Sequence, residues 1–251
     1  MSVLERAVFP TVSVAQVDRW DREWMHYFST ESRYQHLVEY RDLELIDDLG
    51  GKTAKSIFNT TMMRTIDGSE IVPLRIWIDG NHLVGKAVVE IGCGCGWLGK
   101  QLGAISTRYV GIDYSQFALA VARGTSPSNC QYIHVSRHDE LAALEGSFDT
   151  MVGREFFIHQ NFENSIVVLR MGAFFLKSGG IISADFYEPN PEIEQGVIHP
   201  AKSELDPQHA SCGFRFNLDE IQELAELCGL TVVDHVDYLP HQRRFVTFEK
   251  P

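Results

Sequence analysis

Short apolar runs alternate with amphipathic stretches through the last two thirds of the chain. Ala87 to Ile91 is such a run, and the glycines that follow it at once are typical of the end of a buried strand. Strands are predicted on this pattern at 87–91, 109–112, 131–135, 148–152, 181–186, 231–236 and 244–248, with helices from Trp97, Gln116, Ile166 and Leu218. Strands alternating with helices indicate βαβ units and a mostly parallel sheet, with ligands at the carboxyl ends of its strands.

The first third of the chain has a different pattern of apolar residues. Apolar residues recur at helical spacing from about residue 13 to 49, where Gly50 and Gly51 end the pattern, and a further helix is predicted over 72–78. We expect residues 1–84 to form an N-terminal helical cap in front of a core at 85–251. Aromatic side chains at this spacing usually pack in a core, and otherwise they would line an apolar acceptor pocket. The candidates for such a pocket are Trp20, Trp24, Tyr27 and Tyr34, and Phe28 belongs to the same helical stripe as the first three.

Residues 188–216 interrupt the alternation. This insertion holds four prolines and two histidines, His199 and His209. A loop of this length inside a domain is typical of a lid or binding loop, although surface loops also tolerate insertions that have no role.

Composition narrows the classes of protein. A net charge of −12, from 22 basic and 34 acidic residues, lacks the footprint of a protein that binds nucleic acid directly. No apolar run is long enough to cross a bilayer, and the five cysteines are too few for a disulfide framework, so a cytoplasmic protein is expected. Cys93 and Cys95 lie in a glycine-rich turn, and no neighbouring His or Cys pattern completes a metal site. The sequence indicates no oligomeric state.

The strongest chemical signal is the segment 88–96, V-V-E-I-G-C-G-C-G. Alternating glycines after a strand let the backbone turn sharply and approach a ligand, and the next helix offers unpaired N–H groups. Asp113 ends the second strand, 17 residues past Gly96, where an acidic residue accepts hydrogen bonds from ribose hydroxyls in Rossmann-type folds.

These residues resemble the class I S-adenosylmethionine-dependent methyltransferases. Glu90 with Gly92, Gly94 and Gly96 matches their acidic residue followed by G-x-G-x-G, and Asp113 matches the end of their second motif. The segments 147–152, S-F-D-T-M-V, and 176–182, L-K-S-G-G-I-I, are similar to two later landmarks of the family.

The resemblance implies a Rossmann-like α/β fold with a seven-stranded, mostly parallel sheet and an antiparallel last strand. It implies S-adenosylmethionine as cofactor, with Gly92 to Gly96, Cys93 included, around the methionine portion and Glu90 supporting that turn. Asp113 would hold the ribose and Tyr114 would pack beside the adenine. The adenine amino group would meet Ser136, where many members carry Asp, or else Asp139, and Arg154 or Arg64 would pair with the cofactor carboxylate.

A hydroxyl or carbon acceptor usually needs a general base, and His is the commonest one. His159, just after the fourth strand, is the first candidate, against the alternative that it caps or packs on the next helix. Tyr187 and Glu188, at the end of the fifth strand, are the other two candidates for the catalytic site.

The preferred function is methyl transfer to a small molecule, with no nucleic acid or membrane partner expected. An enzyme that cleaves or cyclises the same cofactor would carry the same motifs. Gly94, Gly96 and Gly99 also spell the G-x-G-x-x-G of a dinucleotide-binding protein, and an adaptor without activity would keep the same fold.

Overall fold

The computed structural model divides into two compact units, Ser13–His134 and Met1–Val12 with Val135–Pro251. The structure describes residues 9–11, 14–30, 62–64, 71–73, 77–189, 198–204, 213–238 and 242–251. The predicted features outside these ranges are Tyr34, the stop at Gly50 and Gly51, and His209, and for Tyr27, Phe28 and Arg64 the backbone alone is described.

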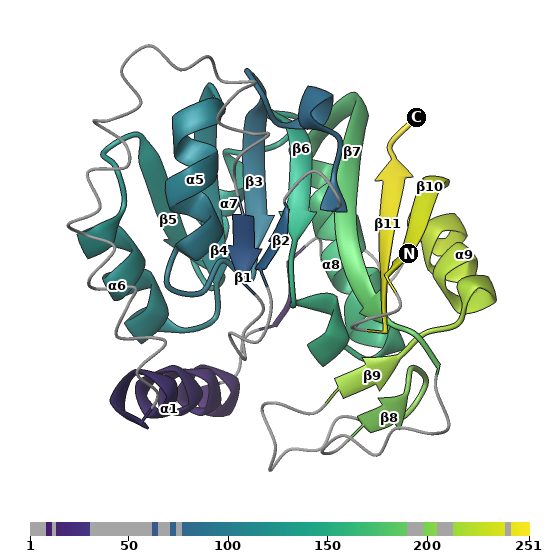
Figure 1. Ribbon diagram of the computed structural model, residues 1–251, viewed down its shortest axis with the longest axis horizontal. Helices are drawn as coiled ribbons and strands as arrows, with labels where there is room; N and C mark the ends of the chain where they lie inside the picture. The colour runs from purple at the N-terminus through teal and green to yellow at the C-terminus, as the bar shows by residue number, and fades with distance from the viewer. Residues whose placement is uncertain are drawn as a thin grey trace. The chain divides into compact units, whose positions relative to one another are not determined.

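The unit Ser13–His134 is built on three parallel strands in the order β3-β4-β5 (Figure 1). Val89 lies opposite Val110, and Ile112 lies opposite Ile133, so the apolar runs of the sequence meet in register. The principal elements are β3 (Ala87–Ile91), α5 (Trp97–Ile105), β4 (Arg108–Asp113), α6 (Gln116–Thr125) and β5 (Cys130–His134). Each parallel neighbour is reached through a helix, as βαβ geometry requires.

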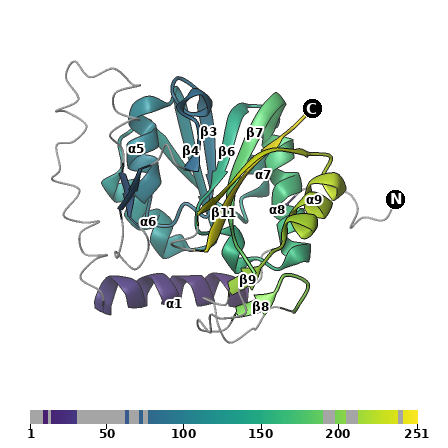
Figure 2. The same ribbon diagram turned by 45° about the vertical axis from the view of Figure 1, so that its right-hand side comes forward.

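The N-terminal helix of the same unit, α1 (Val14–Thr30), lies beside α6 (Figures 1 and 2). It confirms the helical pattern predicted from residue 13. The helix predicted over 72–78 is wrong at its start, because Ile71–Pro73 forms β2 and pairs antiparallel with β1 (Met62–Arg64). Pairing with a partner from elsewhere in the chain overrides local propensity in such a short segment.

The second unit contains four longer strands in the order β10-β11-β7-β6. β6 and β7 run parallel, whereas β11 is antiparallel to both β7 and β10. The elements are α7 (His138–Ala142), β6 (Phe148–Gly153), η4 (Phe157–His159), α8 (Phe162–Phe175), β7 (Leu176–Tyr187), β8 (Ile198–Pro200), β9 (Gly213–Arg215), α9 (Leu218–Leu227), β10 (Thr231–Tyr238) and β11 (Arg243–Glu249). The predicted α/β fold, mostly parallel with an antiparallel ending, is confirmed.

The insertion at 188–216 contributes two short strands. β9 pairs parallel with the end of β7, where Arg215 lies opposite Tyr187, and β8 pairs with β9. The insertion therefore adds strands beside the carboxyl end of β7, the edge at which the sequence predicted acceptor contacts.

Aromatic packing dominates the core of the second unit. Phe186 is fully buried, and its ring centroid lies 5.3 Å from Phe157, 5.0 Å from Phe216 and 6.3 Å from Phe248. These four rings join η4, β7, β11 and the segment before α9, so the core connects elements that are far apart in sequence. In the described part of the chain, no helix is long and apolar enough to cross a bilayer.

Phe186→Ala should lower the free energy of unfolding by about 3 to 5 kcal/mol, because the deleted ring leaves a cavity between three aromatic neighbours. Denaturant titration measures the loss. Val233→Ala on the exposed face of β10, where the side chain is 49% exposed, is the control and should change stability little. Equal losses in the two variants would contradict this account of the core.

Candidate functional site

The turn after β3 has the backbone that its glycine pattern predicts. Gly92, Gly94 and Gly96 have φ values of 70°, 50° and 76°, in the left-handed region that glycine enters without steric cost. The N–H groups of Gly92 and Cys93 both donate to the Ile112 carbonyl, at 2.8 and 3.2 Å, and so tie the turn to β4. Gly96 is the N-cap of α5. The turn thus has the tight backbone that its glycines allow, and it leads directly into the N-terminus of α5.

Cys93 and Cys95 fill the positions between these glycines. Both side chains are buried, and burial raises the pKa of each thiol well above its ordinary value. They are therefore neutral packing groups at physiological pH. Within the described residues, no cluster of His, Cys, Asp or Glu has the arrangement of a metal site.

Glu90, 3% exposed on β3, has a specific buried donor. The hydroxyl of Tyr109 on β4 donates to its Oε2. Burial, reinforced by the charge of Glu90, raises the pKa of Tyr109, so the hydroxyl keeps the proton that it donates. This contact anchors a carboxylate two residues before the turn, in keeping with the supporting role predicted for Glu90.

Asp113, at the end of β4, joins the two segments predicted to hold a ligand. Its Oδ2 accepts the N–H of Gly94 at 2.8 Å, and its Oδ1 accepts the N–H of Ser115 at 2.8 Å. Burial raises the pKa of the carboxyl, while hydrogen bonds from the backbone of Ser115 and Gly94 oppose that rise. The backbone of Tyr114 is a third donor to the carboxylate. Since each of the two oxygens accepts up to two hydrogen bonds, the group keeps capacity for a ligand donor.

Tyr114 follows directly. Its carbonyl lies 2.8 Å from Nε2 of His134 on β5. Burial and the nearby charge of Asp113 raise the pKa of its hydroxyl to about 12. A neutral, half-buried ring beside Asp113 is compatible with the predicted packing against a planar ligand.

Two residues of α1 adjoin this turn, and the sequence assigned neither to the cofactor site. Asp21 accepts hydrogen bonds from Ser115 and Phe117, and Trp24 packs against Cys95 and Ala118. Asp21 stands in no motif, and its partners lie 94 and 96 residues further along the chain. Trp24 belongs to the predicted aromatic stripe, which sequence alone could not place against any particular partner.

The remaining predicted residues, Ser136, Arg154, His159, Tyr187 and Glu188, all belong to the second unit. Ser136 is exposed, just after β5. Arg154 is 6% exposed at the end of β6, donates from Nη2 to Ser183 Oγ at 2.8 Å, and lies 5.4 Å from the centroid of the Phe245 ring. Its predicted pairing with a cofactor carboxylate stays a prediction.

Beside Arg154 lies a buried charged cluster that the sequence did not reveal. The N–H of Glu155 donates to Asp185 Oδ1 at 2.7 Å, and Glu155 adopts a left-handed φ of 54°. Arg243 on β11 pairs with Asp185 at 2.6 Å and with Glu155 at 3.5 Å. The cluster fixes the carboxyl ends of β6 and β7 against β11. Glu155 and Asp185 resemble any other acidic residues in the sequence until β11 brings Arg243 beside them.

Tyr187 lies next to this cluster, with the guanidinium of Arg243 4.5 Å from its ring centroid. Burial raises the pKa of its hydroxyl, so Tyr187 is neutral and acts as a hydrogen-bond donor or acceptor at physiological pH. A phenolate base at this position would need that pKa to fall.

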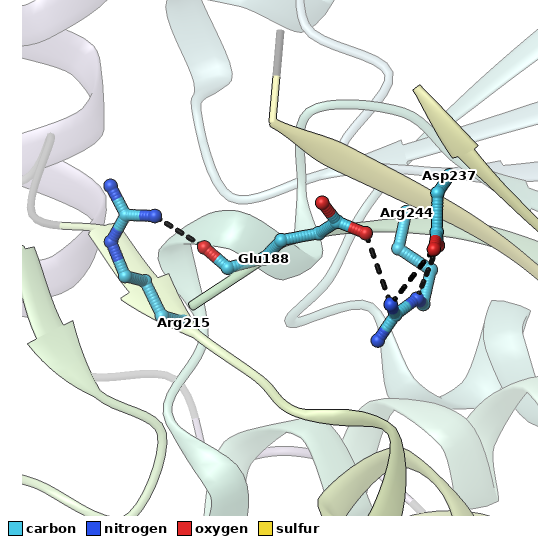
Figure 3. A network of polar contacts seen from close by, with 4 residues as sticks. All are labelled: Glu188, Arg215, Asp237 and Arg244. Atoms are coloured by element: carbon cyan, nitrogen blue, oxygen red, sulfur yellow. Dashed lines mark hydrogen bonds and ion pairs between the residues drawn. The ribbon is translucent and has the colours of Figure 1, made fainter. Parts of the chain in front are cut away.

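Glu188 forms an ion pair with Arg244, with Oε1 3.0 Å from Nη2 (Figure 3). Arg244 also binds Asp237 at 2.6 Å, and Arg215 donates to the backbone oxygen of Glu188. Burial and the neighbouring Asp237 raise the pKa of Glu188, against the effect of Arg244. Its predicted part in catalysis remains open, and its carboxylate is already engaged in a contact between the end of β7 and β11.

His159, the last residue of η4, is half-buried, and its backbone N–H donates to the Phe156 carbonyl at 3.0 Å. It follows β6 on the carboxyl side, as predicted. Its predicted role as a general base stays a prediction.

Comparison with known proteins gives independent findings. A family model described as "Methyltransferase domain" matches residues 88–180, which begin in β3 and end in β7. A ubiquinone biosynthesis O-methyltransferase of Albidiferax ferrireducens is 34% identical over 189 residues, which cover 70% of this chain and 73% of that protein. Another from Aromatoleum aromaticum is 41% identical over 95 residues, which cover 36% of this chain and 41% of that protein. The chain thus spans less than half the length of this second relative.

Among solved structures, the magnesium protoporphyrin IX methyltransferase of Synechocystis PCC 6803 with bound SAH is similar in fold. The TM-score is 0.53 at 12% sequence identity, over 92% of this chain and all of that one. At this level of identity the likeness concerns the fold alone.

Tyr109→Phe tests the anchoring of Glu90. The free energy of unfolding should fall by about 1 to 3 kcal/mol, because a buried carboxylate loses this donor. Denaturant titration measures the change. Tyr132→Phe, whose hydroxyl lies 2.7 Å from the neutral Ser126 Oγ, is the matched control and should cost less. A loss at Tyr132 as large as that at Tyr109 would contradict a special role for the charged acceptor.

Proposed function

Since the chain belongs to the class I S-adenosylmethionine-dependent methyltransferases, with S-adenosylmethionine as cofactor, we propose that it transfers the cofactor's methyl group to a hydroxyl of a small molecule. The observation that carries the proposal is the junction at Asp113. There one buried carboxylate joins the glycine turn to the start of α6 and keeps capacity for further donors. The O-methyltransferase names of the relatives support a hydroxyl acceptor.

The residues of this unit fit the cofactor on their own geometry. The three left-handed glycines give the sharp turn that brings the backbone N–H of Gly94 to Asp113. Asp113 at the end of β4 supplies acceptors for ribose hydroxyls, and the neutral ring of Tyr114 follows it. Gly92, Cys93, Gly94 and Gly96 would hold the methionine portion, with Glu90 behind the turn.

The bound cofactor supplies an electrophilic methyl group on a sulfonium. The work left to the chain is to orient an acceptor oxygen in line with that methyl and to accept the hydroxyl proton. A ring nitrogen of His159 is the proposed proton acceptor. Tyr187 keeps its proton at neutral pH, and the Glu188 carboxylate is paired with Arg244, so both suit acceptor binding better than proton abstraction.

S-adenosylhomocysteine should bind the purified chain and raise its melting temperature, because a ligand of the folded state alone stabilises it by mass action. NAD at the same concentration is the control and should leave the melting temperature unchanged. Incubation with S-adenosylmethionine and a hydroxyl acceptor should release S-adenosylhomocysteine. Release of methylthioadenosine would show a cofactor-cleaving enzyme, and stabilisation by NAD alone would overturn the cofactor assignment.

Cofactor affinity should fall on acidification because of Asp113. Ribose hydroxyls bind an ionised carboxylate more strongly than a protonated one. Burial raises the pKa of Asp113, so its protonation, and with it the loss of affinity, begins at a higher pH than for an ordinary aspartate. Calorimetry with S-adenosylhomocysteine between about pH 8 and pH 5 measures the slope. In Asp113→Asn the affinity should be lower throughout and its slope flatter; a slope equal to that of the wild type would place the titrating group elsewhere.

His159→Ala should lower kcat by on the order of 10² to 10⁴ and leave the dissociation constant of S-adenosylhomocysteine nearly unchanged, because the imidazole would act on the acceptor. The activity of the wild type should also fall as the pH drops below the histidine pKa, and the pH–rate profile of the variant should lack this acidic limb. Tyr187→Phe is the comparison and should act mainly on the KM of the acceptor. A His159→Ala enzyme with near-normal kcat and the same pH profile would make His159 structural.

A further inference from the structure

Helix α1 touches both segments that the proposed function assigns to the cofactor. One contact is made by Asp21. Its Oδ1 accepts the hydroxyl of Ser115 at 2.6 Å and the backbone N–H of Phe117 at 3.0 Å. Ser115 is the N-cap of α6, and its Oγ in turn accepts the N–H of Ala118 at 3.0 Å. Asp21 therefore completes the cap of α6 with a negative charge at the positive end of that helix.

The second contact is made by Trp24. A Cβ added at Gly94 would lie 2.5 Å from Cζ2 of the Trp24 ring, so the indole lies directly on the backbone of the glycine turn. The ring also packs against Cys95 in that turn and Ala118 in α6. Asp21 and Trp24 are three residues apart on α1, which places both side chains on the same face of the helix.

These contacts close a ring of interactions. From α1, Asp21 binds Ser115, whose N–H donates to Asp113. Asp113 accepts the N–H of Gly94, and Gly94 lies against Trp24 of the same helix. Three of these residues, Ser115, Asp113 and Gly94, belong to the segments that the proposed function assigns to the cofactor, and the other two belong to α1.

We infer that α1 acts as a clasp on the cofactor site, in which Asp21 and Trp24 are positioning residues that hold Asp113, Gly94 and the start of α6 in their binding geometry. The inference rests on the proposed function, because it concerns the site assigned there to S-adenosylmethionine. Docking of α1 and binding of the cofactor stabilise the same arrangement of Asp113 and Gly94. Each therefore strengthens the other, as thermodynamic linkage requires.

Moving α1 away from the site would be unfavourable because two donors would lose the hydrogen bonds that Asp21 accepts from them. Ser115 is fully buried, and without Asp21 its hydroxyl and the N–H of Phe117 lose their shared acceptor. A buried donor without a partner is destabilising, so the start of α6 would shift to find another acceptor. Because the Ser115 N–H is bonded to Asp113, that shift reaches the ribose-binding carboxylate.

Asp21→Ala should weaken the binding of S-adenosylhomocysteine about tenfold in calorimetry, because two hydrogen bonds to one acceptor are lost next to Asp113. Asp21→Asn should restore the affinity to within about threefold, because both bonds end on Oδ1 and an amide oxygen can accept them. Asp18→Ala, an exposed aspartate on the same helix, is the matched control and should bind as the wild type does. In turnover, Asp21→Ala should raise the KM of S-adenosylmethionine and leave kcat at saturating cofactor nearly unchanged.

A measurement on the unaltered chain removes any dependence on the folding of a variant. In hydrogen exchange, saturation with S-adenosylhomocysteine should slow the exchange of the backbone amides of Val14–Thr30 in the wild type.

Trp24→Ala should weaken the binding of S-adenosylhomocysteine, and Trp24→Phe should weaken it less.

The outcomes separate the inference from the proposed function. A wild type that does not bind S-adenosylhomocysteine refutes the proposed function, and the clasp falls with it. A wild type that binds, together with an Asp21→Ala variant of equal affinity, overturns the clasp alone. Equal losses in Asp21→Ala and Asp21→Asn, tighter binding by Trp24→Ala, or unchanged exchange in α1 would each overturn it as well.

Discussion

The carboxylate of Asp113 is the group that joins the glycine turn to the start of α6 in the unit Ser13–His134, and it lies at the centre of the proposed cofactor site. Parallel pairing of β3 and β4 brings the glycine turn and the end of β4 to the same edge, and Asp113 then bonds Gly94 on one side and Ser115 on the other. These bonds hold the turn and α6 together before any ligand arrives. The carboxylate is buried, and the backbone donors offset part of the cost of its desolvation.

In the second unit, side chains and not backbone N–H groups stabilise the carboxylates at the strand ends. Glu155 follows β6 and Asp185 lies near the end of β7. The guanidinium of Arg243, on the antiparallel β11, neutralises both carboxylates. Arg244, the next residue, does the same for Glu188 and Asp237 (Figure 3). Consecutive arginines on a strand point to opposite faces, so β11 serves two acidic groups at once. These ion pairs join the carboxyl ends of β6 and β7 to β11.

The family and the cofactor are better supported than the identity of the acceptor. The family and its cofactor agree with the glycine turn and with a carboxylate at the end of β4. The acceptor is a narrower matter, because it depends on side chains such as His159 and Tyr187 that lie outside the cofactor motifs. A similar fold at low sequence identity does not identify the acceptor, since enzymes with the same fold act on many different substrates.

The sequence by itself determined the α/β class, the order of the seven longer strands with most of their bounds, and the glycine turn after β3, although β7 begins five residues before the predicted start at 181. Each of these depends on neighbours in sequence, namely apolar runs, glycines at fixed spacing and a strand-end carboxylate. The strand at Ile71–Pro73, the partnership of Arg243 with Glu155 and Asp185, and the contacts of Asp21 and Trp24 were decided by tertiary structure alone. Their partners lie tens of residues away, and a single Asp or Trp carries no local signal of which distant group it will meet.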